Sequence, residues 1–242
     1  MSTPRDTIYS TPRTAIDRFA FDDTVASVFP DMIQRSVPGY STIVAMTGVL
    51  ADRYAKPGTR CYDLGCSLGA SSFAMAQYLN DRDCRIVAVD NSQAMLTRLS
   101  ERLPDFTVPV DMVCADIRNI DIRSASVVVL NFTLQFLEPE SRNALLREIY
   151  NGMVKGGILI LSEKIRFADP HLQELNTDLH HAFKKSNGYS DLEIAQKRSA
   201  LENVLQPETL DTHEQRLRSA GFSSVDVWFQ CFNFASLVAI KA

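Results

Sequence analysis

Short apolar runs alternate with segments of helical apolar spacing through the middle of the chain. The apolar runs are predicted to be strands, at residues 60–64, 84–89, 110–114, 127–131 and 157–161. Helices are predicted between them, at residues 68–79, 93–103 and 142–153. Strands that alternate with helices indicate βαβ units, because parallel neighbours need a crossover connection. The pattern therefore predicts an α/β fold built on a mainly parallel sheet.

The region before this alternation has a different character. Residues 1–20 are polar and rich in Thr, Pro and Arg, which predicts a flexible N-terminal arm. Apolar residues then follow a helical period over residues 22–54, with a break at Pro38-Gly39. This segment is predicted to form N-terminal helices of a single domain that covers residues 21–242.

The C-terminal region changes pattern again. Residues 171–220 are helix-like, with breaks at Asn187-Gly188 and Pro207, and we expect this helical insertion to act as a lid. Two strands follow, at 225–229 and 234–240, and their short connection makes them antiparallel to each other. The predicted fold is thus a Rossmann-like, mainly parallel seven-stranded sheet with an antiparallel C-terminal strand pair and a helical insertion before it.

Composition narrows the classes of function. With 45% hydrophobic and 22% charged residues, the 242-residue chain can bury a sizeable core. Its formal net charge of -4 argues against gripping a polyanion such as tRNA, since phosphate binding depends on clustered Lys and Arg. Five cysteines without CxxC spacing fit neither a disulfide framework nor a zinc ribbon. The sequence shows neither a signal peptide nor a membrane-spanning stretch, so we expect a cytoplasmic protein without a membrane partner.

The most informative motif lies at the end of the first predicted strand, where residues 62–69 read Tyr-Asp-Leu-Gly-Cys-Ser-Leu-Gly. Gly65 allows a tight turn and a close approach of a ligand to the backbone. The G-x-G-x-x-G fingerprint of dinucleotide enzymes is missing, which argues against a nicotinamide oxidoreductase. The order Asp-x-Gly-x-x-x-Gly is similar to the first motif of class I S-adenosylmethionine (SAM)-dependent enzymes. A tight turn without a ligand is the alternative interpretation.

Polar residues also follow the next strands, and carboxyl ends of parallel strands form the ligand crevice of such sheets. Asp90, at the end of the second strand, is placed to bind ribose hydroxyls. The alternative is that Asp90 caps the next helix, but Ser92 can serve as that cap instead. Asp116 follows the third strand, at a position where the SAM family uses an acid near the adenine. The alternative interpretation of Asp116 is an ordinary turn residue at a strand end. We expect the SAM-binding residues to include Gly65, Cys66, Ser67, Asp90, Asn91, Asp116, Ile117 and Asn131.

Longer blocks resemble a narrower family, the bacterial carboxy-S-adenosylmethionine synthases. The blocks are residues 29–40, 63–69, 131–137, 196–199 and 228–234, and the likeness runs from about residue 20 to the C-terminus. The resemblance implies that prephenate aromatises to phenylpyruvate as it loses its ring carboxylate and hydroxyl. The released carbon dioxide is captured by the SAM methyl carbon, acting as a sulfonium ylide, which gives carboxy-SAM. It further implies a homodimer without a metal, whose product passes to a tRNA carboxymethyltransferase that modifies wobble uridine, with no direct contact to nucleic acid.

The resemblance also implies roles for two further residues. Arg198 would bind the new carboxylate near the adenosyl pocket, from the same chain or across a dimer interface. Tyr40 would pack near the amino acid part of SAM. From the residues alone, a solvated helix charge is the favoured interpretation of Arg198 and of Lys197 beside it, and Tyr40 is equally readable as a core residue at a helix break.

Other charged residues carry weaker indications. The basic side chains Arg35, Lys164 and Lys184 are candidates for binding the prephenate carboxylates, and the sequence does not rank them. No histidine is assigned a catalytic role: His180 and His181 point to different sides of a helix, while His171 and His213 are expected to be exposed. No metal-ligand motif accompanies them.

Two other functions remain open at this point. An ordinary SAM-dependent methyltransferase, acting on a small molecule or tRNA, would use the same core motifs. A non-catalytic SAM-binding module would bind the ligand without turnover.

Overall fold

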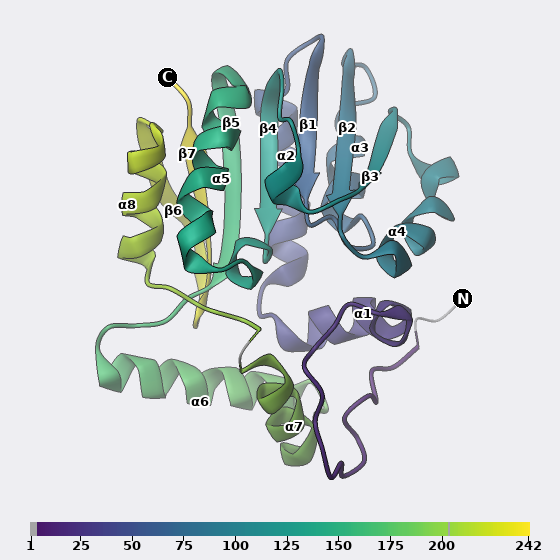
Figure 1. Ribbon diagram of the computed structural model, residues 1–242, viewed down its shortest axis with the longest axis vertical. Coiled ribbons are helices and arrows are strands. Elements are labelled where there is room, and N and C mark those ends of the chain that lie inside the picture. The colour runs from purple at the N-terminus through teal and green to yellow at the C-terminus, as the bar shows by residue number, and fades with distance from the viewer. Residues whose placement is uncertain (1–3, 203) are drawn as a thin grey trace.

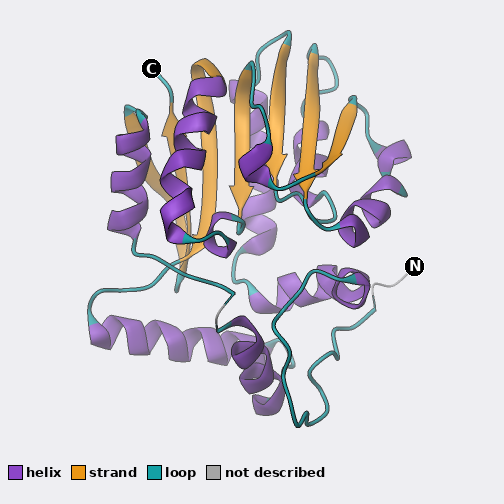
Figure 2. Cartoon of the chain, in the orientation of Figure 1, coloured by secondary structure: helices purple, strands orange, loops and turns teal. Residues whose placement is uncertain are grey.

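The computed structural model describes residues 4–202 and 204–242, and its centre is a twisted sheet with helices on both faces (Figures 1 and 2). The strand order is β3-β2-β1-β4-β5-β7-β6. The strands are β1 (Thr59–Leu64), β2 (Cys84–Asp90), β3 (Val110–Cys114), β4 (Ala125–Asn131), β5 (Met153–Lys164), β6 (Ser224–Cys231) and β7 (Phe234–Ile240). Strands β1 to β5 run parallel, whereas β7 is antiparallel to both β5 and β6. The predicted seven-stranded sheet and its antiparallel C-terminal pair are confirmed.

Apolar residues on both sides of the central strands explain why helices cover both faces. On one face, Tyr62 and Leu64 of β1 pack with α5 (Pro139–Gly152) and α8 (Leu210–Ala220). On the other face, Cys61 packs with α2 (Tyr40–Tyr54) and α3 (Ala70–Ala76), and α4 (Gln93–Ser100) lies against β2 and β3. Side chains alternate along a strand, so a parallel strand that is covered twice needs a nearly continuous apolar run.

A second layer lies beyond the carboxyl ends of the parallel strands, at the bottom of Figure 1. It contains α1 (Asp23–Ser36), α6 (Pro170–Ser186) and α7 (Asp191–Leu201). A capping box between Ser190 and Glu193 begins α7 and fixes its first turn. The predicted helix breaks at Pro38-Gly39, Asn187-Gly188 and Pro207 all fall between helices.

The helices of the predicted insertion divide between two parts of the fold. The sequence predicts a lid over residues 171–220, yet only α6 and α7 lie in the layer beyond the strand ends. Helix α8 packs instead against α5 and β6, because it buries Leu217 and Ala220 in the main core. Across the described residues, no helix is both long and apolar enough to cross a membrane.

The N-terminal segment, residues 4–22, is more firmly held than the sequence suggests. The sequence predicts a flexible arm over residues 1–20, of which residues 1–3 lie outside the described part of the chain. Asp6 and Tyr9 are 1% and 7% exposed. The Asp6 carboxylate accepts a hydrogen bond from the Tyr189 hydroxyl at 2.5 Å and lies 3.7 Å from Lys197 Nζ. Polar partners on the second layer thus hold the start of this segment, in addition to the apolar contacts of Ile8, Phe19 and Phe21.

Candidate active site

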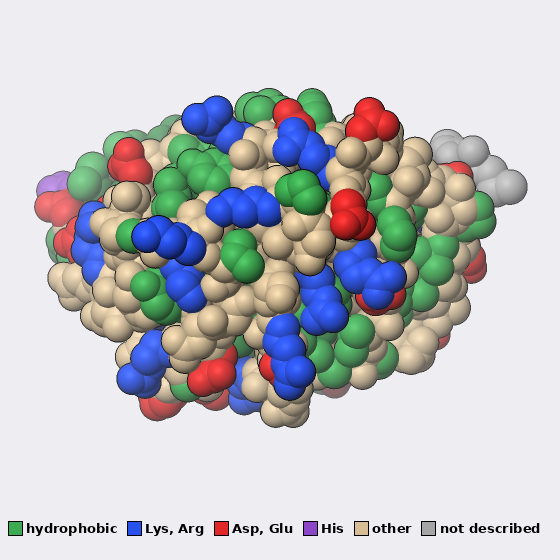
Figure 3. Space-filling view, turned by 90° about the horizontal axis from the view of Figure 1, so that it is seen from above, with side chains coloured by type: hydrophobic (Ala, Val, Ile, Leu, Met, Phe, Trp, Pro, Cys, Tyr) green, Lys and Arg blue, Asp and Glu red, His purple; other side chains and the backbone are tan. Residues whose placement is uncertain are grey.

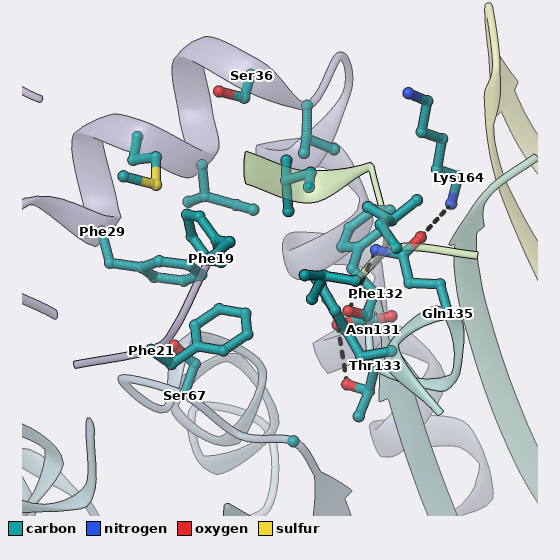
Figure 4. A pocket seen from close by; sticks show the side chains of 18 of the residues that line it. Phe19, Phe21, Phe29, Ser36, Ser67, Asn131, Phe132, Thr133, Gln135 and Lys164 are labelled. Carbon is teal, nitrogen blue, oxygen red and sulfur yellow. Dashed lines mark hydrogen bonds between the residues drawn. The ribbon is translucent and has the colours of Figure 1, made fainter. Parts of the chain in front are cut away.

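A cavity of about 370 Å³ lies between the carboxyl ends of the strands and the second layer, a size suited to a small-molecule site (Figure 4). Nine of the ten predicted site residues line it: Tyr40, Gly65, Cys66, Ser67, Asp90, Asn91, Asp116, Ile117 and Asn131. The remaining one, Arg198, does not. The strand topology brings eight of the nine together from four strand ends, and Tyr40 reaches the cavity from the start of α2.

The turn after β1 shapes one end of the cavity. Gly65 has a φ of +79°, and a Cβ there would lie 2.3 Å from Thr133 Oγ1, so only glycine fits. Ser67 follows in the left-handed region at φ 49°, and its backbone N–H donates to Asp90 Oδ2 at 2.8 Å. The strained turn therefore holds the ends of β1 and β2 in a fixed relation.

Asp90 does not cap the helix that follows it. That position belongs to Ser92, whose hydroxyl accepts from the Met95 N–H, while the Asp90 carboxylate accepts from the backbone N–H groups of Ser67 and Ser92. Burial raises the pKa of Asp90, and these N–H groups counteract that effect. The Asp90 carboxylate is thus fixed in position at the cavity wall.

Asp116 combines two roles at the end of β3. Its carboxylate accepts from the backbone N–H of Arg118 at 2.9 Å and forms an ion pair with the Arg118 guanidinium at 2.5 Å. The hydrogen bond from the Arg118 side chain holds the pKa of Asp116 below its ordinary value. Asp116 therefore forms the turn after β3 and lines the cavity at the same time.

The end of β4 is fixed by polar contacts and strain. The Asn131 amide donates to Ser71 Oγ at 2.9 Å and accepts from Ser162 Oγ at 2.6 Å. Phe132 then adopts a φ of 60°, which is uncommon for a bulky residue. Its ring lies 6.3 Å from that of Tyr40, and burial raises the pKa of the Tyr40 phenol, which stays protonated.

An aromatic wall closes the side of the cavity opposite β4. Figure 4 shows Phe19, Phe21 and Phe29 together on that side, facing Asn131 and Thr133. The ring of Phe21 lies 5.2 Å from Phe19 and 5.3 Å from Phe136. Phe19 and Phe21 belong to the N-terminal segment, so the sequence analysis missed them, although the apolar Phe19-Ala20-Phe21 after a polar stretch could have indicated them.

Three lysines line the other end of the cavity: Lys164 at the end of β5, Lys184 on α6 and Lys197 on α7. Burial is the main cause that lowers the pKa of Lys184 to about 7 and of Lys197 to about 8. Lys164 is affected in the same direction. The sequence places Lys164 and Lys184 among the basic candidates but expects Lys197 to be solvated, and that expectation is wrong, because Lys197 is buried.

Comparison with known proteins identifies the family. A profile described as "Methyltransferase domain" matches residues 62–157. Curated proteins named carboxy-S-adenosyl-L-methionine synthase are 59% identical in Trichlorobacter lovleyi and 57% identical in Geobacter sp. strain M21, over 100% of both chains in each case. A protein of that name from Vibrio cholerae serotype O1 is 57% identical over 98% of each chain. The chain belongs to the carboxy-S-adenosyl-L-methionine synthase family.

Solved structures support the fold of this synthase family member. Human N-acetylserotonin methyltransferase in complex with SAM matches with a TM-score of 0.61 and 18% identity, over 91% of this chain and 55% of that one. Magnesium protoporphyrin IX methyltransferase from Synechocystis, with bound SAM, matches with a TM-score of 0.57 and 14% identity, over 90% and 84%. At these identities the likeness shows the class I SAM-dependent methyltransferase fold alone, which agrees with the predicted one.

Arg198 lies outside the cavity of this synthase chain. It is exposed on α7, while Lys197 beside it is buried and faces the cavity. Adjacent helical residues point about 100° apart, and on α7 Gln196 and Lys197 are turned inward while Arg198 is turned outward. The Arg198 charge still contributes to lowering the pKa of Lys164 and Lys184, which places it beside the lysine end of the cavity.

The histidines divide between the cavity and the core. His180 lines the cavity, and its Nε2 lies 2.8 Å from the Ser36 carbonyl oxygen, to which it donates. Burial lowers the pKa of His180 to about 2, so the ring is neutral. His171 is exposed as expected, but His213 is 1% exposed, because its side of α8 faces the sheet layer. No cluster of three metal-ligating side chains occurs among residues 4–202 and 204–242.

The Arg35 side chain also does not line the cavity. Its guanidinium donates to Asp31 at 3.0 Å and to the Asn187 carbonyl oxygen at 2.7 Å, and it stacks 3.8 Å from the Tyr189 ring centroid. These contacts tie α1 to the α6–α7 connection. Of the three basic candidates, Lys164 and Lys184 therefore remain at the site.

Proposed function

We propose that the chain converts SAM and prephenate to carboxy-SAM and phenylpyruvate. The observation that carries the proposal is full-length identity of 57–59% to carboxy-S-adenosyl-L-methionine synthases. The cavity supports it, since one end has the strand-end polar groups suited to SAM and the other end has three lysines suited to an anionic donor. Neither the glycine turn nor the fold by itself separates this reaction from methyl transfer.

The proposed reaction balances without a further reagent. In prephenate the bond between the ring and its carboxylate breaks, hydroxide leaves the ring, and the ring becomes aromatic. A new carbon–carbon bond joins the released carbon dioxide to the SAM methyl carbon. The methyl proton and the departing hydroxide leave together as water.

The cavity walls favour this chemistry over side reactions. A carbanion beside a sulfonium is quenched by water, and the rings of Phe19, Phe21 and Phe136 exclude water from one side. Holding the carbon dioxide beside its acceptor gives a large effective concentration. The N-terminal segment and the α6–α7 pair therefore serve as the cover of the site.

Arg198 would bind the new carboxylate of carboxy-SAM in a homodimer. Arg198 is exposed on α7. It would reach the ligand when the cover of the site closes, or it would reach the ligand of a second copy across an interface. Helix α6, which packs against α7, also exposes Leu172 and Leu175 at 47% and 52%. Light scattering coupled to gel filtration should give twice the mass of one chain, and a monomer would contradict this part of the proposal.

The product would pass in the cytoplasm to a separate tRNA carboxymethyltransferase, and this protein would not contact the tRNA. On the face shown in Figure 3, basic side chains are interspersed with acidic and apolar ones. Exposed arginines are paired in several places, as in the ion pairs of Arg82 with Asp52 and Arg85 with Asp111. Such a surface lacks the single-sign charge that phosphate binding needs.

Mass spectrometry of the products tests the reaction directly. Purified protein is incubated with SAM in the presence and absence of prephenate. Carboxy-SAM and phenylpyruvate should appear together, and only when both substrates are present. Formation of S-adenosylhomocysteine with an acceptor would favour a methyltransferase, and unchanged SAM despite tight binding would favour a binding module.

A further inference from the structure

The lysine end of the cavity carries more positive charge than its surroundings neutralise. Lys197 Nζ donates to Ser36 Oγ at 3.0 Å and lies 3.7 Å from the Asp6 carboxylate. Among the described residues, neither Lys164 nor Lys184 has an ion pair through its ammonium group. Two unpaired cations therefore face the cavity from β5 and α6.

These two cations are built into rigid elements. The Lys164 backbone N–H donates to Gln135 Oε1 at 2.9 Å. Figure 4 draws this bond as a dashed line, on the side of the cavity away from Ser67. Lys184 is 9% exposed in the last turn of α6. Mutual repulsion contributes to lowering the pKa of Lys184, so an anion bound between the two groups would be stabilised by both.

The chemistry decides which anion belongs there. One carboxylate of prephenate becomes carbon dioxide, so it loses its charge on the way to the transition state. A strong cation contact with that group would stabilise the ground state more than the transition state and slow the reaction. The carboxylate of the 2-oxo acid side chain keeps its charge throughout and remains in phenylpyruvate.

We propose that Lys164 and Lys184 form the subsite for the 2-oxo acid carboxylate of the donor, the group that passes unchanged into phenylpyruvate. This inference rests on the proposed function for the identity of the donor. It assigns the lysine end to substrate orientation, with the ring and its departing carboxylate directed toward the SAM end. Lys197 contributes charge but is held by the N-terminal segment.

Binding of phenylpyruvate tests the subsite without relying on turnover. Phenylpyruvate is titrated calorimetrically into protein saturated with SAM, for the wild type, Lys184→Met and Lys164→Met. Each substitution should weaken phenylpyruvate binding on the order of 10- to 100-fold, the usual effect of losing a hydrogen bond to a charged group. The KM for prephenate should rise by the same factor, while the SAM Kd stays within about twofold of the wild-type value.

Matched controls lie on the same two elements. Lys185→Met removes an exposed charge from the same turn of α6, and Lys155→Met removes one from the other end of β5; neither should alter binding. Retained SAM affinity reports folding, and if one variant fails to fold, the other decides the result.

Three results would overturn the subsite. Phenylpyruvate affinity could be unchanged in both folded variants or absent in the wild type, in which case the lysines do not hold this group. Alternatively, prephenate alone could lose affinity, which would assign the lysines to the departing carboxylate. A wild type that binds phenylpyruvate through the lysines but forms no carboxy-SAM would refute the proposed function and leave the subsite standing.

Discussion

Replacement of Glu163 by Gln should stabilise the protein at neutral and alkaline pH. Glu163 is fully buried in β5 directly behind the cavity. Its Oε1 accepts from the Leu134 N–H at 3.0 Å, whereas Oε2 has no hydrogen-bond partner among the described residues. Burial raises the pKa of Glu163 to about 8, although the Arg142 charge acts in the opposite direction. The carboxyl is therefore protonated in the native state at neutral pH.

The sign and size of the effect follow from the difference in pKa. Below pH 4.5, the ordinary value, both the folded and the unfolded states are protonated at Glu163 and its titration costs nothing. As the pH rises from there to about 8, the unfolded state releases the proton and the folded state keeps it, so stability falls. At about 1.4 kcal/mol per pKa unit, the cost is about 3 kcal/mol at pH 7 and between about 4 and 5 kcal/mol above pH 8.

Glutamine keeps the oxygen that accepts from Leu134 and is neutral at every pH, so it should remove this slope. Urea unfolding at intervals from pH 5 to pH 9 measures the free energy of unfolding of both proteins. The two curves should coincide near pH 5 and separate by a few kcal/mol at pH 9. Glu148→Gln, on the exposed side of α5, should keep the wild-type slope. Parallel curves for wild type and Glu163→Gln would refute the raised pKa.

Three other substitutions test separate parts of the structure. Gly65→Ala would place a Cβ against Thr133 in a left-handed turn, so the SAM Kd measured by calorimetry should rise about 10-fold or more; an unchanged Kd would mean that the turn does not contact the ligand. Arg142→Met removes one of the two buried arginine partners of Glu208 and leaves the Leu137 and Gln206 carbonyl groups without this donor, so thermal unfolding should show a loss on the order of 3 kcal/mol, with an unaltered Tm as the contrary result. Arg198→Met should weaken carboxy-SAM binding on the order of 10- to 100-fold in a competition assay while SAM affinity is kept; equal effects on both ligands would contradict its proposed role.

The sequence predicts the sheet and one end of the site well, for a physical reason. Strands covered on both faces require continuous apolar runs, and parallel topology then places the residue after each run at one edge. Gly65, Asp90 and Asn131 could be placed in this way, although their partners could not. The strand order and the motif suffice to place these three residues at the cavity wall.

The second layer is where sequence reasoning fails. Helix α7 has no clear apolar stripe, so nothing in its sequence indicates that Lys197 faces inward and Arg198 outward. The N-terminal segment buries hydrogen-bonding groups as well as apolar ones, and Asp6 finds its partner at Tyr189. Such pairs are specified by tertiary contacts alone, which a local pattern cannot reveal.

The hydrogen bond between Asp6 and Tyr189 joins positions 183 residues apart, and this has a consequence for the order of folding. Contacts of such long range form late, because the chain entropy lost on closing the loop must be offset by structure already present. The parallel strands from β1 to β5 are complete in sequence before α7 has left the ribosome, but the Asp6 carboxylate lacks its partners Tyr189 and Lys197 until then. A nascent chain that ends before α7 would therefore lack Lys197 at the lysine end of the cavity and the ion pair that holds Asp6, so ligand binding reports on late steps of folding.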